Sequence, residues 1–270
     1  SVVFYIPVAG FKAVDEDIDV DNLYKQDQFI MFEEEEAFRT KLSGFQRCTR
    51  DKSDINDDLP LNVVLIGNRN VIRDTLFRAG WKLPGTFSFS TAFKTAEAFF
   101  SGKFPLSVPV APQYLFGRKQ DISIHKGRDS LHERNCLNLW RTPWIFKGKN
   151  VWIGNISRDI GIKRKSKSLN FANKIDPDID NAYYYLFMDV MMAQGLAKFG
   201  VVKYIGKSTP ENPGTTLSGS PYWTGGKRAV LLFSDDRIAM DEIDFFNWDF
   251  NQSVKEAIQE MEQKSRETGL

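Results

Sequence analysis

The sequence predicts a mixed α/β fold, in which helices flank a central mixed sheet. Two patterns carry this prediction. Short apolar runs rich in Val, Ile and Leu, at residues 61–67 and 229–234, are typical of strands that are buried on both faces. Apolar residues at helical spacing follow the first run over residues 71–81, and such spacing recurs over residues 179–199. Strands and helices that alternate in this way favour a layered α/β domain.

The other elements follow from local patterns along the chain. The four glutamates at residues 33–36 favour the start of a helix within residues 29–42, because acidic side chains complement the helix dipole there. Apolar runs and spacings predict strands at residues 113–116, 121–125, 136–141, 151–162 and 201–206, and helices at residues 91–100 and 253–266. Residues 142–150 contain the Gly and Lys of a hairpin loop.

A polar run at residues 47–60 suggests a boundary between parts of the chain. We expect an acidic N-terminal extension at residues 1–59, an α/β domain at residues 60–235 and a C-terminal helical tail at residues 236–270. The extension and the domain can still share one core.

The charge of the chain is distributed unevenly. The 36 basic and 35 acidic residues nearly cancel, and the 42% hydrophobic content is that of a globular protein rather than a disordered or coiled-coil chain. Residues 1–60 nevertheless carry a net charge of −7, residues 61–169 carry +13, and residues 170–270 carry −5. A basic centre suits phosphate, an anionic lipid surface or nucleic acid. Alternatively, the acidic ends fold back and neutralise it.

Several familiar motifs are weak or missing. The sequence GKST at residues 206–209 is no P-loop, because Val201 stands where the first Gly is needed and prolines follow. HERNC at residues 132–136 resembles a zinc-protease helix but runs into a predicted strand. The chain has only two His and no GxSxG elbow, which leaves little material for a catalytic triad. Cys48 and Cys136 are most simply two free thiols, although a single disulfide stays open.

Two groups of residues are candidate sites. Arg134, Arg141 and Arg158, with Trp140 nearby, could bind an anionic ligand, since Arg forks suit phosphate oxygens. Trp140 also fits a core position, and the basic run at residues 163–167 also fits a solvated loop.

The second group is acidic. Asp176, Asp178 and Asp180, with Asp159, could hold a divalent metal through hard oxygen ligands. The favoured alternative is that Asp176 caps a helix with Pro177 at its first position, and that Asp178 and Asp180 lie in its first turn.

Taken together, several motifs resemble the bacterial LssY C-terminal domain family, in the family's order over roughly residues 60–233. The motifs are LNVVLIG (61–67), AGW (79–81), YLFGRKQD (114–121), LWRTP (139–143), VWIG (151–154), DIGI (159–162), IDPDID (175–180) and SPYWTGGKRAVLL (220–232). The resemblance implies an envelope-associated accessory domain and no particular reaction. It also implies residues that this chain lacks: His pairs where Asn135–Cys136 and Asn173–Lys174 stand, and Asp where Ser220 and Gly225 stand.

We therefore expect a binding or accessory module, degenerate as an enzyme and without a cofactor, associated with the membrane of a bacterial envelope. Its partners would be an anionic lipid or another phosphate-bearing ligand, or a membrane protein, and no sequence-specific nucleic acid. One alternative is a metal-assisted hydrolase of phosphate esters or lipids that uses the four Asp. Another is a protein-interaction module, in which deletion of residues 1–58 leaves a folded domain and removes partner binding.

Overall fold

The computed structural model describes residues 20–83, 112–127, 133–164, 171–203 and 206–248. The helices predicted at residues 91–100 and 253–266, His132 and most of the basic run at residues 163–167 lie outside the described residues.

The described residues form a mixed sheet of nine strands, which confirms the predicted fold class. Its order is β1 (Ile30–Phe32), β8 (Glu133–Phe146), β9 (Lys149–Arg164), β4 (Val63–Ile66), β14 (Lys227–Phe233), β11 (Leu196–Lys203) and β15 (Asp244–Phe245), with β7 (Ile122–Gly127) beside β8 and β10 (Phe171–Ile175) beside β9. The pairs β1–β8, β4–β14 and β11–β15 are parallel. Every residue of β4 is buried, as its apolar run predicts.

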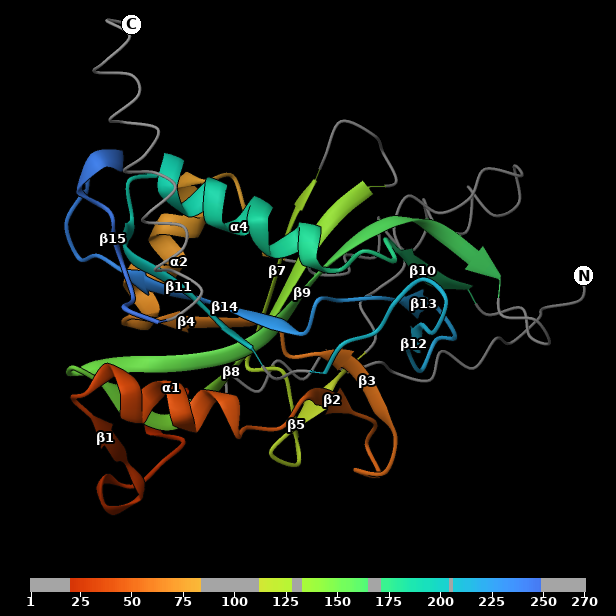
Figure 1. Cartoon of the computed structure of the whole chain (residues 1–270), viewed down its shortest axis with the longest axis horizontal. Helices are drawn as coiled ribbons and strands as arrows, with labels where there is room; N and C mark the ends of the chain where they lie inside the picture. Colours follow the sequence, from red (N-terminus) through yellow and green to blue (C-terminus); the bar gives the residue numbers. More distant parts are fainter. Residues whose placement is uncertain (1–19, 84–111, 128–132, 165–170, 204–205, 249–270) are drawn as a thin grey trace, which may run out of the picture.

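Helices and a small sheet cover the two faces (Figure 1). On one face lie α2 (Arg69–Arg78) and α4 (Asp180–Met192), and on the other lies α1 (Glu35–Ser43). The small sheet lies on the α1 side and contains β3 (Asp57–Pro60), β2 (Cys48–Arg50), β5 (Tyr114–Leu115) and β6 (Arg118–Lys119). A separate short hairpin pairs β12 (Gly214–Thr215) with β13 (Pro221–Tyr222).

Each face of the sheet has its own hydrophobic core. Beneath α2 and α4, Leu76 and Leu186 pack in one cluster with Val63 and Leu65 of β4. Beneath α1, the other cluster contains Phe38 and Leu42 together with Val64, Ile66 and Trp140. Because side chains alternate along a strand, β4 contributes to both clusters.

The N-terminal segment is joined to the main sheet at several points. β1 pairs with the end of β8, and Phe38 of α1 is fully buried. Arg228 of β14 donates hydrogen bonds to the backbone oxygens of Leu42, Gln46 and Leu61 at 2.6–2.9 Å. One buried guanidinium of β14 therefore links the end of α1, the segment after it and the residue that follows β3.

The helix predicted over residues 179–199 is shorter in the structure. α4 ends at Met192, Gln194 adopts a left-handed conformation with φ 56°, and β11 begins at Leu196. Gly195 closes the turn by donating to the oxygen of Val190, and a Cβ at Gly195 would lie 2.3 Å from Thr75 of α2. The prediction was wrong beyond residue 192 because apolar residues of a buried strand happened to continue the helical spacing.

The hairpin loop predicted at residues 142–150 is also shorter. β8 continues to Phe146, and only Lys147 and Gly148 form the turn, with φ 46° and 74°. Positive φ at both central positions matches the twist of a two-residue hairpin. Pro143 was the misleading signal, since the strand passes it with an irregularity in pairing between Arg141 and Ile145.

Candidate functional site

Polar and charged side chains gather where β8, β9 and β10 run side by side. In this register Arg134 lies opposite Asp159, Asn135 lies opposite Arg158, and Ile175 also pairs with Asp159. We call this group the strand-end cluster; its members are Glu133, Arg134, Cys136, Arg158, Asp159 and Asp176. Arg134, Arg158, Asp159 and Asp176 of the two predicted groups thus come from three segments of the sequence to the same end of the sheet.

Arg134, Asp159 and Cys136 form one half of the strand-end cluster. Arg134 Nε donates to Asp159 Oδ2 at 2.9 Å, and Cys136 Sγ lies 3.4 Å from the same oxygen. Burial raises the pKa of the Cys136 thiol far above its ordinary value, and the nearby Asp159 raises it further. Burial also raises the pKa of Asp159, with Arg134 acting in the opposite direction. At neutral pH Cys136 is therefore a protonated thiol rather than a nucleophile.

Arg158 forms the other half of the strand-end cluster. Its guanidinium binds Glu133 of β8, and its Nη1 lies 3.4 Å from Asp176 Oδ2. Its Nε and the Oδ1 of Asn135, which lies opposite on β8, are buried and have no hydrogen-bond partner. Since neighbouring residues of a strand point to opposite faces, Arg158 and Asp159 project on different sides of the sheet.

Arg141 and Trp140 lie elsewhere. Arg141 is 4% exposed, and its guanidinium donates to Asn150 Oδ1 and to the oxygens of Thr142, Trp144 and Val151. Trp140 is fully buried in the α1-side core. The structure thus brings Arg134 and Arg158 to the same end of the sheet and separates Arg141 from both.

The aspartates before α4 form consecutive turns. Asp176 Oδ1 accepts the backbone N–H of Asp178, and Asp178 Oδ1 accepts that of Asp180, both at 3.2 Å. Asp180 in turn accepts from the Thr224 hydroxyl and the Gly225 N–H at 2.7 Å. Within the described residues, no three His, Cys, Asp or Glu side chains are grouped so that they could hold a metal ion.

The capping prediction was partly wrong. α4 begins at Asp180, which lies in its first turn as expected, but the residue before it is Ile179 and no side chain caps the helix. Asp176 lies too early in the chain to cap the helix. Its carboxylate instead shapes the turn and contacts Arg158. Asp178 likewise orders the turn that precedes the helix.

Most positions where the resemblance implies His or Asp also lie close to this region. Asn135 and Cys136 on β8, and Asn173 and Lys174 on β10, flank β9 from its two sides. Gly225 contacts Asp180 through its N–H, whereas Ser220 is buried in a turn with Thr216. The implied site residues would therefore lie on both sides of β9, and this chain has two amides, a thiol and a Lys there.

The two thiols are separate and buried. Cys48 and Cys136 form no disulfide. Burial raises the pKa of Cys48 to about 11, and Asp57 acts in the same direction. Neither thiol is therefore reactive at neutral pH.

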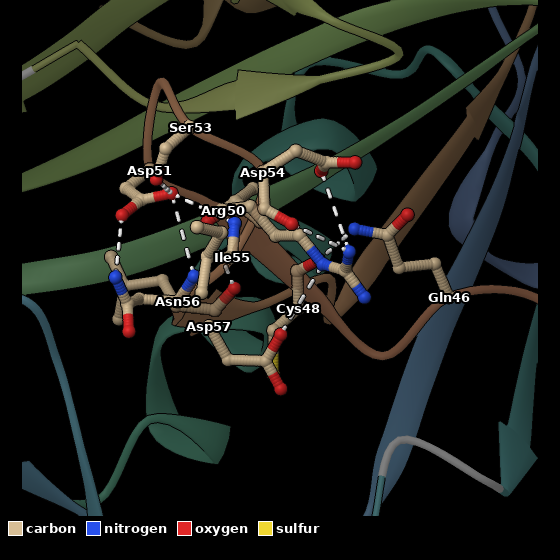
Figure 2. A network of polar contacts seen from close by, with 11 residues as sticks. Gln46, Cys48, Arg50, Asp51, Ser53, Asp54, Ile55, Asn56 and Asp57 are labelled. Carbon is tan, nitrogen blue, oxygen red and sulfur yellow. Dashed lines mark hydrogen bonds and ion pairs between the residues drawn. The ribbon is translucent and has the colours of Figure 1, made fainter.

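The acidic loop at residues 51–57 satisfies its own polar groups (Figure 2). Asp51 accepts hydrogen bonds from the side chains of Ser53 and Asn56 and from the N–H of Ile55, and these bonds hold its pKa well below the ordinary range. Arg50 forms ion pairs with Asp54 and Asp57. The carboxylates of this loop are used locally and do not neutralise the basic centre of the sequence.

A different basic surface lies on α2 and beside α4. In α2, residues 81–83, β7 and the second half of α4, the basic side chains are Arg69, Arg73, Arg78, Lys82 and Lys126, and the acidic ones are Asp74 and Asp189. Exposed apolar side chains stand among them, namely Phe77, Leu83, Met188 and Met192. We call this surface the basic-apolar face; its net charge is +3.

Contacts with α4 hold part of the basic-apolar face together. Lys126 Nζ lies 2.7 Å from Asp189, and the indole N–H of Trp81 donates to the same carboxylate. Arg78 donates to the backbone oxygen of Ala193. Sequence reasoning missed this face, because its residues come from three separate segments. One available signal was α4 itself, whose sequence is apolar on every side.

Comparisons with known proteins give one match. The family model described as "LssY C-terminus" matches residues 40–227, which is more than half of the chain. No curated protein and no solved structure matches. The matched residues run from α1 to the start of β14, and they include the strand-end cluster and the basic-apolar face. The chain belongs to the LssY C-terminus family.

Proposed function

We propose that this domain is an accessory or binding module of the bacterial envelope that associates with an anionic, phosphate-bearing membrane surface. The observation that carries the proposal is the basic-apolar face. Its five basic side chains come from the positively charged middle of the sequence, and it lies on the side of the sheet away from α1 and the glutamates at its start. A face of this charge attracts anionic headgroups.

The chemistry of the strand-end cluster supports binding over catalysis. Arg134 and Arg158 are engaged with carboxylates of the protein, and the Cys136 thiol beside Arg134 is buried and protonated. Asp159 already accepts from Arg134 and contacts Cys136. A general base or nucleophile must be able to reach a substrate atom, and neither group has that access. The cluster is better suited to fixing β8, β9 and β10 to one another.

None of the three predicted anion-binding arginines carries this proposal, and Arg158 is itself paired with Glu133 and Asp176. It lies close enough to Tyr185 of α4 for the two groups to interact electrostatically, so it stands at the N-terminal part of the same helix. Arg141 is used inside the protein, where its guanidinium binds backbone oxygens. Arg134 projects to the other side of the sheet.

The test is co-sedimentation with vesicles at two ionic strengths. The proposal predicts binding to vesicles that contain an anionic phospholipid, little binding to purely zwitterionic vesicles, and weaker binding as salt rises from roughly 0.05 to 0.5 M, because salt screens exposed charges. Replacing Arg73, Arg78 and Lys82 together by Ala should weaken binding by up to about 3 kcal/mol, or roughly a hundredfold, at about 1 kcal/mol for each basic residue.

A matched control replaces three basic residues outside the basic-apolar face, Lys25, Lys52 and Lys147, by Ala. These side chains are exposed or half-exposed. The control should bind as the wild type does. Equal binding to anionic and zwitterionic vesicles, or an equal loss in both triple variants, would remove the proposal.

A further inference from the structure

α4 carries an exposed apolar stripe along its length. Tyr184, Met188 and Met192 follow one another at intervals of four residues, and Tyr185 lies beside them. They are 40–67% exposed, which is high for large apolar side chains. The opposite side of the helix, with Leu186 and Val190, is fully buried against the sheet. α4 is therefore apolar both toward the core and toward the outside.

The helix dimensions fit a membrane surface. α4 has 13 residues, so its length is roughly 20 Å at 1.5 Å per residue. Within the described chain, no helix is both long and apolar enough to cross a bilayer. A short helix with an outward apolar side and basic neighbours instead suits a position parallel to the bilayer plane.

Basic side chains flank the stripe from its start to its end. Arg158 lies near Tyr185, Lys126 contacts Asp189 in the middle, and Arg78 binds the oxygen of Ala193 just beyond the last turn. Long basic side chains can reach headgroup phosphates while apolar neighbours enter the lipid. Exposed Tyr also favours the interfacial region of a bilayer.

We propose that α4 is the part of this domain that enters an anionic bilayer, lying flat at its surface with Met188 and Met192 reaching the acyl region. Arg78, Lys82 and Lys126 then lie at the level of the headgroups, and Tyr184 and Tyr185 lie at the boundary. This inference rests on the proposed function and assigns the membrane contact to one helix.

The charge of the face favours an anionic bilayer over a second copy of the chain. A two-fold dimer through α4 would bring the same surface of both copies together. When the whole of α4 is counted, Asp180 included, each surface still has a net charge of +2, so the basic groups around the stripe would repel one another. An anionic bilayer instead complements this charge and accepts the apolar stripe.

A single labelled thiol tests the position of α4. Met192→Cys would carry an environment-sensitive fluorophore, and Ile55→Cys would be the control, since Ile55 is 76% exposed in the loop between β2 and β3. The native thiols are buried with raised pKa values, so the introduced Cys should react first. With anionic vesicles, we expect a blue-shifted, brighter emission at position 192 and no change at position 55.

Substitutions test the same contact without a label. Met188→Gln with Met192→Gln should reduce the partition coefficient onto anionic vesicles about tenfold or more, because two apolar side chains lose their lipid contact. Met31→Gln is the matched control, since Met31 is 58% exposed on β1. It should bind as the wild type does.

The outcomes separate this inference from the proposed function. If the wild type does not bind anionic vesicles, the proposed function fails and this inference fails with it. If the wild type binds while the double Met variant binds equally and the label at position 192 stays unshifted, only the assignment of α4 is wrong. A concentration-dependent dimer that the double Met variant abolishes, without vesicle binding, would show that a second copy covers α4 instead.

Discussion

The two faces of the central sheet are covered in opposite ways. On the α1 face, the helix is held to the sheet by buried aromatic side chains and by Arg228, whose guanidinium binds three backbone oxygens. On the α2 and α4 face, the inner sides of the helices are equally well buried, but their outer sides expose Phe77, Met188 and Met192. α1 thus exposes no large apolar side chain, whereas α2 and α4 together expose several.

The two faces of the sheet also differ in charge. Glu33 to Glu36 line a cavity of about 460 Å³ at the start of α1, together with Lys147 and Trp248. Lys147 and Lys198 both contact Glu35, so basic groups are neutralised there by an excess of acidic ones. The basic-apolar face keeps a net positive charge. The acidic N-terminal segment therefore neutralises basic groups of its own side and leaves the opposite face positive.

The largest loss of stability should follow from deleting the segment that covers the α1 face of the sheet. Deletion of residues 1–58 removes β1, α1 and β2, and with them the buried side chains of Phe38 and Leu42. Each large buried side chain contributes about 2–5 kcal/mol, which together rivals the stability of a typical domain. We predict that the shortened chain shows no cooperative thermal transition. A folded remnant in circular dichroism, as a protein-interaction module would predict, would contradict this.

Substitution of Arg228 should cause the second-largest loss of stability. Arg228→Met keeps the volume but leaves the oxygens of Leu42, Gln46 and Leu61 without their donor. Burial lowers the pKa of Arg228 to about 9, so the group is still charged at neutral pH. We predict a loss of about 3 kcal/mol in the free energy of unfolding by urea. Arg73→Met on the exposed side of α2 should change it by less than about 0.5 kcal/mol.

Asp159 should make stability depend on pH. Its pKa in the folded protein is raised above the ordinary 3.8, chiefly by burial, so the folded state binds a proton more strongly than the unfolded state does. This contribution is complete below the unfolded pKa and is lost as pH rises through the folded pKa. Asp159→Asn should remove that decline in urea-unfolding profiles that begin below pH 4 and extend to neutral pH. An unchanged profile would contradict the assignment.

Divalent metals should have the smallest effect. The carboxylates of Asp176, Asp178 and Asp180 accept hydrogen bonds within the protein, and in the described residues they do not converge on a common point. We predict that Mg²⁺, Mn²⁺ or Zn²⁺ leaves Tm unchanged beyond the effect of matched ionic strength. A saturable rise in Tm would instead favour a metal-assisted hydrolase, because a bound ion stabilises the folded state.

The sequence was a good guide to strands and a poor guide to which side chains meet. The buried run of β4 and the apolar β14 could be recognised directly, because strands buried on both faces are apolar throughout. The end of α4 could not be recognised from the sequence, since Leu196 and Phe199 of β11 continue a helical spacing by chance. Periodicity alone does not distinguish a buried strand from the continuation of a buried helix.

The candidate site was predictable in composition only. Arg134 and Arg158 lie at the same end of the sheet because of the β8–β9 register, which local patterns do not specify. Arg141, of the same residue type, is buried and bound to backbone oxygens. The role of a basic side chain in this protein depends on which face it projects from, and that becomes known only with the pairing of the strands.

The most direct test of the difference between the faces is side-chain footprinting with a photogenerated carbene, with and without anionic vesicles. Our account predicts that vesicles protect Phe77, Met188 and Met192, while Met31 and Ile55 on the α1 side keep their labelling. These five side chains are 40–76% exposed in the protein alone, so each can report a change. Protection of Met31 and Ile55, with unchanged labelling along α4, would contradict the account.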